Sequence, residues 1–463
     1  MKRFLSRVLP LLLSFGLIFN CTGCSTVLVL AGKARENSEA SSSVISESSA
    51  SSGIISTPVP TEDSDLRAFY TDVANAESVT VMVYMIGSDL ESEDGSATDD
   101  LLEMVDAALS ENIHLVLQTG GTETWWNDVC TDDESERFVI ENGDMTLLQS
   151  LGSVNMTDAD TLSDFIRFSA ESYPADRYEL ILWDHGGGTM TGFGYDELYE
   201  DTSLTLSSLS TALYNGGVQF DFIGFDACLM ATAEVAYALD PYADYLIASE
   251  ESEPGEGWAY KNWLTLLAED PAVPTAELGK KLADDFLEAY IFADMPTLSV
   301  LDLRYVPELY AALESYWGSA YTALQSGSYG AFSQVRNNVR EFGDNEYDQV
   351  DLSDLATLTK QSLSLGTEDD VQAAVQNMVV YNVTYEKSAA GIAVYFPCLW
   401  PDYYGDTRFE MTCVGFPESY FEFYDKFMNT MLSGQSLSQS DIDFYSYYCL
   451  LYTSDAADDL IGV

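Results

Sequence analysis

Reactive side chains follow two buried-looking segments of the chain. The run LILW leads into Asp184, His185 and three glycines, and the run FIGF leads into Asp226, Ala227 and Cys228. An imidazole near a thiol lowers the pKa of the thiol or takes its proton, which produces a thiolate nucleophile near neutral pH. The charged imidazole can then protonate a leaving amine. If the two segments are adjacent parallel strands, this pattern indicates nucleophilic catalysis by a cysteine.

The glycines after His185 have a chemical interpretation of their own. Gly186 to Gly188 carry no side chains, so a substrate backbone can approach them closely. We expect the N–H of Gly186 to donate to an oxyanion together with the N–H of Cys228, which we place at the start of a helix. Taken singly, a histidine after a strand or a cysteine in an apolar run is often structural. Their equivalent positions after successive strands favour catalysis.

The elements that position these residues alternate along the chain. Buried strands and amphipathic helices follow one another from residue 78 onward, which predicts an α/β fold with a mostly parallel sheet covered by helices on both sides. Such sheets collect reactive groups at the carboxyl ends of their strands. The predicted strands are 78–87, 112–121, the segment YELILWDHGGG (178–188), 220–230, 242–251, 296–303 and 389–397, and the predicted helices are 97–109, 157–173, 231–239 and 275–292.

Composition and charge exclude one class of partner. The 463 residues are 47% hydrophobic and 13% aromatic, so most of the chain can form a packed core. It carries 19 basic and 76 acidic residues, for a net charge of -57. Such a surface repels phosphate backbones, so we expect no nucleic-acid partner. It attracts cations, including peptides rich in Lys and Arg, although high negative charge also simply keeps an exported protein soluble.

The N-terminal segment has the pattern of an export signal. Residues 1–23 begin with basic side chains and continue as an apolar run that is too short for a stable membrane span. The sequence CTGC resembles a bacterial lipobox, with Cys24 as the lipidated residue and Cys21 where leucine is usual. We therefore expect a protein lipid-anchored to the outer side of the cytoplasmic membrane, with the anchor as its only membrane attachment.

Three further regions are predicted from composition. Residues 24–65 are rich in serine and form a flexible tether, and residues 66–448 form the folded domain. Residues 449–463 contain CLLYTSDAADD, which resembles a translated sequencing adapter, so we assign that tail no function.

The cysteine and acidic residues do not predict a metal centre. The chain contains two histidines and no zinc-type cysteine spacing in its body. His114 lies within a predicted strand, where packing or an exposed strand face is expected. A disulfide between Cys398 and Cys413 is compatible with an oxidising location. Residues 344–355 carry five acids but lack EF-hand spacing, so we expect a solvated acidic face.

The paired motifs LILWDHGGG and FDFIGFDACLMA resemble those of the clostripain family of cysteine peptidases, within the caspase-like clan. The resemblance extends to YADYLIASEESEPGEGW and covers roughly residues 78 to 400. It implies a caspase-like αβα sandwich with a mostly parallel central sheet. It also implies that His185 is the general base and acid, that Cys228 is the nucleophile, and that the chemistry needs no cofactor.

The resemblance further implies cleavage after Arg or Lys by means of acidic pocket residues. Asp226 matches one such position, although it could instead cap the helix expected at Cys228. Among the glutamates after the fifth strand we favour Glu256, which lies in a Gly-Glu-Gly turn. Trp125 and Trp126 either wall the substrate cleft or form an ordinary surface cluster.

Four questions stay open: calcium binding, the site of self-cleavage, a rival function and the oligomeric state. Some relatives depend on calcium, so the resemblance allows a bound calcium ion. Members are often activated by self-cleavage at a basic residue, and the sequence does not choose among Arg137, Arg167, Arg177 and Lys261. The rival function is a non-catalytic surface lipoprotein that binds cationic peptides or ions. The sequence does not determine the oligomeric state.

Overall fold

A computed structural model describes residues 66–432, except 133, 200–201, 291–295 and 386. The chain divides into two compact units, Met1–Ser52 and Gly53–Val463, and all described residues belong to the second. The predicted signal peptide, the lipidation site at Cys24, the tether and the adapter-like tail lie outside the described residues. Within the described part of the chain, no helix is long and apolar enough to cross a membrane.

A nine-stranded sheet forms the centre of the described unit, in the order β11-β8-β7-β6-β5-β1-β2-β3-β4. Its five central strands are parallel. All five were predicted from their continuous apolar runs, as expected for strands buried on both faces. They are β1 (Val79–Ile86), β2 (Ile113–Gly120), β5 (Arg177–Trp183), β6 (Phe220–Asp226) and β7 (Ala243–Ala248).

The outer strands are antiparallel and were mostly not predicted. They are β3 (Ser135–Glu141), β4 (Asp144–Gly152), β8 (Thr297–Asp302) and β11 (Val379–Thr384), of which only β8 was expected. Asn142 and Gly143 join β3 to β4 with φ values of 54° and 79°. Asn-Gly is a common two-residue turn in β-hairpins, so this hairpin could have been predicted from the sequence.

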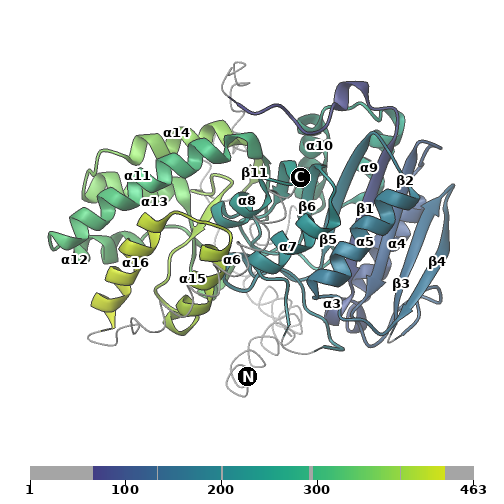
Figure 1. The fold of residues 1–463 in the computed structure, drawn as a ribbon, viewed down its shortest axis with the longest axis horizontal. Helices are drawn as coiled ribbons and strands as arrows, with labels where there is room; N and C mark the ends of the chain where they lie inside the picture. The colour runs from purple at the N-terminus through teal and green to yellow at the C-terminus, as the bar shows by residue number, and fades with distance from the viewer. Residues whose placement is uncertain (1–65, 133, 200–201, 291–295, 386, 433–463) are drawn as a thin grey trace, which may run out of the picture. The chain divides into compact units, whose positions relative to one another are not determined.

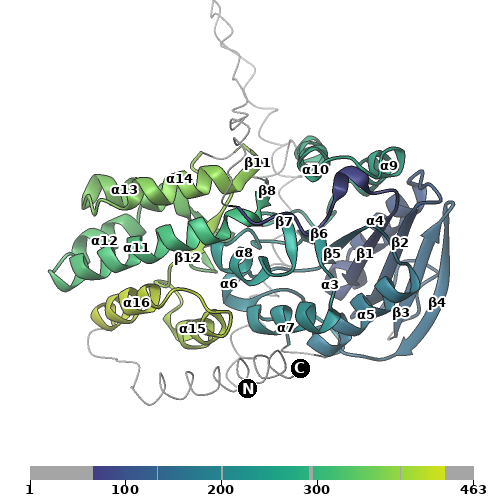
Figure 2. The same ribbon diagram turned by 45° about the horizontal axis from the view of Figure 1, so that its top comes forward.

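Helices cover both faces of this sheet (Figures 1 and 2). Alternate residues of β1 belong to different hydrophobic clusters, with Tyr84 on one face and Val83 on the other. The expected αβα sandwich is confirmed. One face packs against α5 (Ala159–Ser172), α7 (Leu206–Gly216) and α8 (Ala233–Leu239), and the other against α4 (Ser96–Asp106), α9 (Tyr260–Glu269) and α10 (Thr275–Ala289).

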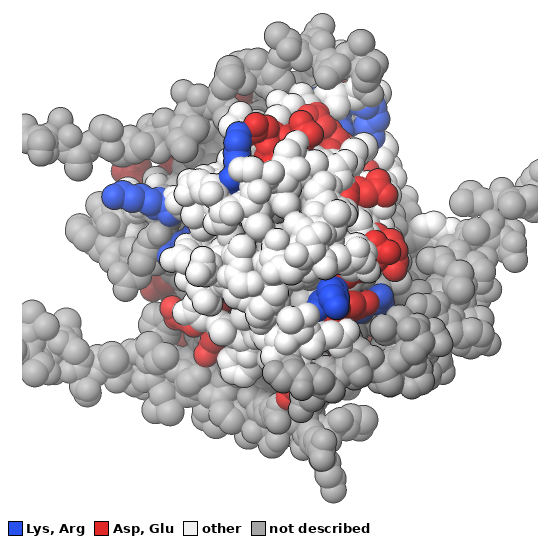
Figure 3. Space-filling model, turned by 90° about the vertical axis from the view of Figure 1, so that its left-hand side faces the viewer, with Lys and Arg blue, Asp and Glu red and all other residues white. Residues whose placement is uncertain are grey.

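The C-terminal part shares the core of the first sheet face. It is mostly helical: α11 (Val306–Gln325), α12 (Tyr329–Arg336), α13 (Leu352–Ser362), α14 (Glu368–Met378), α15 (Tyr404–Cys413) and α16 (Glu418–Met431). A small sheet contains β9 (Glu341–Phe342), β10 (Gln349–Asp351) and β12 (Ala393–Tyr395), the last within the strand expected at 389–397. Uncharged residues cover most of the face in Figure 3.

Short elements complete the described chain. The α-helical turns are α3 (Ser88–Ser92) and α6 (Gly188–Thr191). The 3-10 turns are η1 (Val73–Asn75), η2 (Leu303–Tyr305), η3 (Gly343–Asn345) and η4 (Pro401–Tyr403).

Two expectations for this region are wrong. Cys398 is a free thiol whereas Cys413 is disulfide-bonded, so no bridge joins the two. The acidic run at 344–355 is not simply a solvated face. Asp348 is fully buried and accepts hydrogen bonds from Arg336 and the Leu399 and Trp400 N–H groups. Asp351, also buried, accepts from the N–H groups of Asp354 and Ala390. These carboxylates fix local structure.

Candidate active site

The two predicted catalytic residues follow adjacent parallel strands. Trp183 at the end of β5 pairs with Asp226 at the end of β6, and the Asp184 N–H donates to the Asp226 carbonyl at 3.3 Å. His185 and Cys228 each stand two residues beyond this pair. The adjacency on which the predicted dyad depends is therefore present in the fold.

Gly186 brings the two loops into contact. A Cβ atom at Gly186 would stand far inside van der Waals distance of the Cys228 carbonyl oxygen, and 3.1 Å from the Cys228 nitrogen. The first glycine is thus required by the fold, in addition to any role in substrate approach. Neither the Gly186 N–H nor the Cys228 N–H donates to a group within the described residues. Both predicted oxyanion donors therefore stay free.

Cys228 lies in a turn and not at a helix start, which corrects the expectation. The helix α8 begins at Ala233, and Thr232 caps it by accepting from the Val235 N–H. Leu229 next to the nucleophile has a left-handed φ of 69° although it is a branched residue. Its carbonyl accepts from the Gln349 side chain at 2.9 Å. Strained backbone of this kind persists only where surrounding contacts enforce it, and it clusters at functional sites.

His185 contacts a carboxylate that the sequence analysis did not identify. Its Nε2 lies 2.7 Å from Oδ1 of Asp89 in α3, and each side chain is 28% exposed. Burial lowers the pKa of His185, but the hydrogen bond to Asp89 and the charges of Asp184 and Asp89 outweigh it and raise that pKa to about 9. The imidazole is therefore protonated at neutral pH in the ligand-free protein.

Cys228 is a protonated thiol in the same state. Its Sγ accepts a hydrogen bond from the Glu253 N–H at 3.2 Å. Burial, followed by the charges of Glu253 and Glu251, raises the pKa of the thiol to about 12 despite that N–H donor. The ligand-free site thus holds an imidazolium beside a thiol.

Asp184, whose role the sequence left open, is buried beside His185. One of its carboxylate oxygens accepts a hydrogen bond from the Tyr195 N–H. Burial raises the pKa of Asp184 to about 7, although the neighbouring His185 charge opposes this. Asp184 therefore anchors the segment that follows the glycines.

Asp226 belongs to a buried group of three carboxyl groups. Its Oδ2 accepts hydrogen bonds from the Trp258 N–H at 3.0 Å and the Tyr260 hydroxyl at 2.8 Å, so it does not cap a helix at Cys228. A Cβ atom at Gly257 would lie 2.5 Å from Asp100 Oδ2 and 2.9 Å from Asp226 Oδ2. The two carboxyl groups therefore lie close together beside Gly257.

The third member of this acidic group is Glu253. Its Oε2 accepts from the Trp258 indole at 3.1 Å, and its Oε1 is buried without a hydrogen-bond partner. Burial is the largest cause that raises the pKa of all three groups, to about 7 for Asp226 and well above the usual range for Asp100 and Glu253. No described Lys or Arg forms an ion pair with any of the three. The acidic group is therefore suited to a cation supplied from outside.

The remaining predicted residues occupy different environments. Glu256 is exposed in the turn that precedes the buried Gly257. Trp125 is buried in the core, so it does not wall a cleft, whereas Trp126 is 60% exposed and its indole donates to the Ser92 carbonyl. His114 lies on β2 with its Nδ1 3.5 Å from Glu141, as expected for a residue on a strand face.

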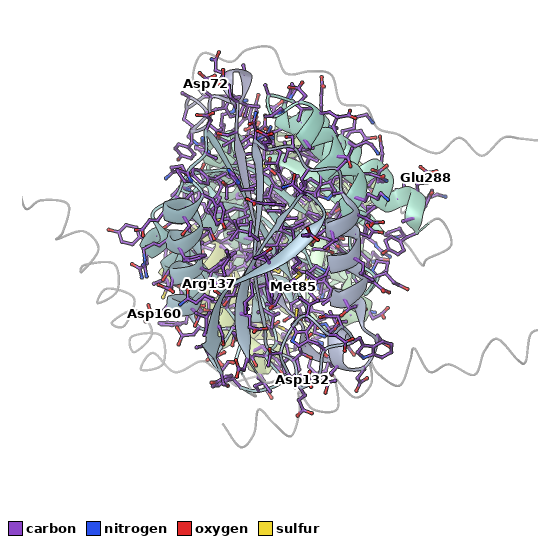
Figure 4. The ribbon with its side chains drawn as sticks, turned by 90° about the vertical axis from the view of Figure 1, so that its right-hand side faces the viewer. Asp72, Met85, Asp132, Arg137, Asp160 and Glu288 are labelled. Atoms are coloured by element: carbon purple, nitrogen blue, oxygen red, sulfur yellow. The ribbon has the colours of Figure 1, made fainter. Side chains whose placement is uncertain are left out.

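The four basic residues considered for self-cleavage all lie in strands or helices. Arg137, labelled in Figure 4, is buried in β3 and donates to Gln118 and Asp164. Arg177 is buried in β5 and paired with Asp221. Arg167 and Lys261 are exposed but lie within α5 and α9. Two of the four are buried within sheet strands and the other two lie in helices, so none is presented in the folded state as the exposed extended backbone that a protease binds.

The described residues offer no cluster of three or more His, Cys, Asp or Glu side chains arranged to hold a metal ion. Asp89 and Asp100 were not predicted from the sequence. Glu253 is one of the glutamates after the fifth strand that were candidates for the pocket, among which Glu256 was favoured. Asp89 and Asp100 lie in a hydrophilic segment that follows the buried strand β1, and this position was the feature that could have identified them as site residues.

Comparisons with known proteins agree with this geometry. A model of the clostripain family matches residues 83–442. Clostripain from Hathewaya histolytica is 29% identical over 217 residues, which cover 40% of this chain and 41% of that protein. The match thus spans less than half of clostripain.

Two solved structures share the fold. One is an inactive zymogen C11 protease from Parabacteroides distasonis, with 22% identity and a TM-score of 0.56, covering 75% of this chain and 98% of that one. The other is a secreted C11 cysteine protease from Bacteroides thetaiotaomicron in complex with an irreversible peptide inhibitor, with 20% identity and a TM-score of 0.57, covering 75% and 99%. At these identities the likeness shows the fold alone.

Proposed function

The chain belongs to the clostripain family of cysteine peptidases, and we propose that it is an endopeptidase that cleaves after Arg or Lys through His185 and Cys228. The observation that carries the proposal is the register of β5 and β6, which places the two residues at equivalent positions beyond a paired Trp183 and Asp226. Neighbouring parallel strands lie about 4.8 Å apart, so both side chains leave the same edge of the sheet.

The reaction begins when Cys228 loses its proton to solvent beside the His185 imidazolium. The thiolate attacks the scissile carbonyl carbon, and the Gly186 and Cys228 N–H groups donate to the resulting oxyanion. The imidazolium gives its proton to the leaving amine as the C–N bond breaks. The neutral imidazole then takes a proton from water, which attacks the thioester and releases the acid product and the thiolate.

Because Cys228 is protonated in the ligand-free site, the loss of its proton is the step of the reaction with the largest free-energy cost. A thiol with a pKa of about 12 is almost wholly protonated at pH 7. In the proposed mechanism the His185 imidazolium, whose pKa of about 9 keeps it charged, stabilises the thiolate that forms.

The specificity proposal rests on the acidic group of Asp100, Asp226 and Glu253. A buried carboxylate forms a charge-assisted, often bidentate pair with a guanidinium, and it binds an ammonium as a point charge. The group connects to the nucleophile through Glu253, whose N–H contacts Cys228 Sγ while its side chain joins Asp226. Glu256, exposed in the adjacent turn, is the predicted outer acid of this pocket.

The test compares the wild-type protein with Cys228→Ala on fluorogenic peptides with Arg, Lys or Leu before the cleaved bond. We expect hydrolysis of the Arg and Lys peptides by the wild type alone. Asp226→Asn should lose this preference, with Glu269→Gln as the matched variant that removes an exposed carboxylate at the end of α9. Equal hydrolysis by wild type and Cys228→Ala would contradict the mechanism. Binding of basic peptides without hydrolysis by either protein would favour the non-catalytic alternative.

We also propose export and lipid anchoring at Cys24, supported by the signal-like segment 1–23. Metabolic labelling with a fatty-acid analogue should mark the wild type and not Cys24→Ser. No cofactor is needed by the proposed chemistry. A calcium requirement is tested by the loss of hydrolysis in a chelator and its recovery on addition of calcium.

A further inference from the structure

Asp89 reaches the candidate active site from a third strand of the sheet. β1 pairs with β5 on the side opposite β6, with Met85 beside Trp183. The turn α3 follows β1 and carries Asp89, whose Oδ1 lies 2.7 Å from His185 Nε2. Three adjacent parallel strands thus supply a carboxylate, an imidazole and a thiol in that spatial order.

Contacts other than the one to His185 hold α3 in place. Glu91 is fully buried and accepts hydrogen bonds from the Thr98 N–H at 2.8 Å and the Trp126 N–H at 2.7 Å. The Trp126 indole donates to the Ser92 carbonyl. Ser88, just before Asp89, has a left-handed φ of 48°, which only an enforcing environment maintains. The position of the Asp89 carboxylate is therefore imposed by the scaffold.

The chemistry of imidazole defines what Asp89 can do there. A histidine ring has two nitrogen atoms, and a partner at one of them fixes the ring orientation and which nitrogen faces the reaction. Since Nε2 is engaged by Asp89, Nδ1 is the nitrogen left for Cys228 and the leaving amine. A carboxylate at Nε2 also stabilises the imidazolium that the thiolate requires.

We infer that Asp89 is a positioning residue of the catalytic centre, which orients His185 through Nε2 and keeps it charged beside Cys228. This inference rests on the proposed function of His185 and Cys228. The residues that interact with the His185 ring are Asp89 from α3, Asp184 after β5 and Tyr195, whose ring centroid lies 6.4 Å away.

Asp89 and Asp184 differ in charge, which assigns the role to Asp89. Burial raises the pKa of Asp89, but the hydrogen bond to His185 and its charge outweigh burial, so that pKa is lowered. Burial raises the pKa of Asp184 to about 7, so Asp184 is only partly ionised at neutral pH. Asp89 is the carboxylate that stays ionised throughout the working range and contacts the ring directly.

The scarcity of histidine makes a direct test available, because the chain contains only His114 and His185. NMR titration of both imidazoles, without a polyhistidine tag and with His114→Gln for assignment, reports the pKa of His185. The variant is Asp89→Asn, which keeps the shape of the side chain. The matched control is Glu93→Gln, which removes an exposed carboxylate from the end of the same turn.

In Asp89→Asn we expect the pKa of His185 to fall by at least about one unit. The acid limb of the kcat/KM profile on an Arg peptide reports His185, because the pKa of His185 lies below that of the Cys228 thiol, so this limb should move with it. We expect kcat to fall about 10- to 100-fold with KM changed less than about twofold. Glu93→Gln should match the wild type. Asp89→Ser provides the same readouts if Asp89→Asn does not fold.

An unchanged His185 pKa and an unmoved acid limb in folded Asp89→Asn would overturn the inference, whatever happens to kcat. A drop in kcat alone would mean that Asp89 acts only on local structure. Titration in the Cys228→Ala background separates this result from the proposed function. If the wild type hydrolyses nothing, the proposed function fails, but the imidazole titration still decides whether Asp89 controls His185.

Discussion

The replacement of Gly186 by alanine tests whether the two catalytic loops must touch. The added Cβ would lie 3.0 Å from the Cys228 carbonyl carbon and 3.1 Å from its nitrogen, and closer still to the oxygen. Carbon atoms in favourable contact are about 3.5 to 4.0 Å apart. All three neighbours are backbone atoms, so no flexible side chain can move away. The β5 and β6 loops must therefore separate.

The size of the effect follows from this geometry. Relieving the closest of these contacts, that with the carbonyl oxygen, requires a movement of more than about 1 Å between the loops. Overpacking of this kind costs about 1–3 kcal/mol of stability. A misplacement of about 1 Å between reacting groups lowers rates by about 100-fold. We therefore expect a modest loss of stability in Gly186→Ala and a loss of kcat of about 100-fold.

The assay measures kcat, KM and thermal unfolding on an Arg-containing fluorogenic peptide. The matched control is Gly318→Ala in α11, where an added Cβ meets no atom within 4 Å. Alanine is the better helix former, so this control should be stabilised by about 0.5–1 kcal/mol with unchanged kcat. If Gly186→Ala retained kcat within threefold of the wild type, the reasoning that the glycine sets the position of Cys228 would be refuted.

Four further outcomes follow from the buried acids and the free thiol. Asp226→Asn should lower kcat/KM for Arg peptides at least about tenfold and leave a Leu peptide unaffected; an equal loss on both would remove the specificity argument. Burial raises the pKa of Asp226 to about 7, so the folded state binds its proton more tightly than the unfolded chain. Stability from this group is therefore lost as pH rises from about 4 through 7, and thermal unfolding between pH 5.5 and 8 should show a smaller decline in Asp226→Asn. Conversely, kcat/KM for Arg peptides should rise over the same range as Asp226 ionises; a flat profile would count against the pocket. Alkylation of the native protein without reductant should modify Cys398 and spare disulfide-bonded Cys413, and modification of both would contradict the assignment.

The sequence predicted the pair of catalytic strands because their signals are local. Continuous apolar runs identify the buried strands β5 and β6, and the reactive residues follow each run directly. Pairing between the two strands was then the simplest arrangement of successive parallel strands. The His185 and Cys228 prediction needed nothing else from the fold.

The partners of these residues could not be predicted in the same way, because they come from distant segments. Asp89 is 96 residues from His185 along the chain, and its hydrophilic surroundings resemble any loop after a strand. Asp100 lies on the face of α4 that packs near Gly257. This contact forms only because two segments that are distant in the sequence pack together. Periodicity marks a helix face as polar or apolar, but it does not show which polar residue is buried.

Some errors had local causes. The Asn142-Gly143 turn between β3 and β4 was readable as a hairpin. The helix expected at Cys228 begins later because Leu229 adopts a left-handed conformation, which ends any helical continuation from β6. Trp125 was expected either to wall the substrate cleft or to lie in a surface cluster, yet it packs in the core through tertiary contacts that its local sequence does not show.

The most direct measurement for the central claim is covalent labelling by an arginine-based irreversible inhibitor, followed by mass-spectrometric mapping of the modified residue. Cys228, Cys130 and Cys398 are the free thiols among the described residues, so the choice among them is informative. The account predicts modification of Cys228 alone, at a rate that falls in Asp226→Asn and vanishes on replacement of Cys228 by alanine. Labelling of Cys130 or Cys398 in place of Cys228, or an equal rate with a leucine-based inhibitor, would contradict it.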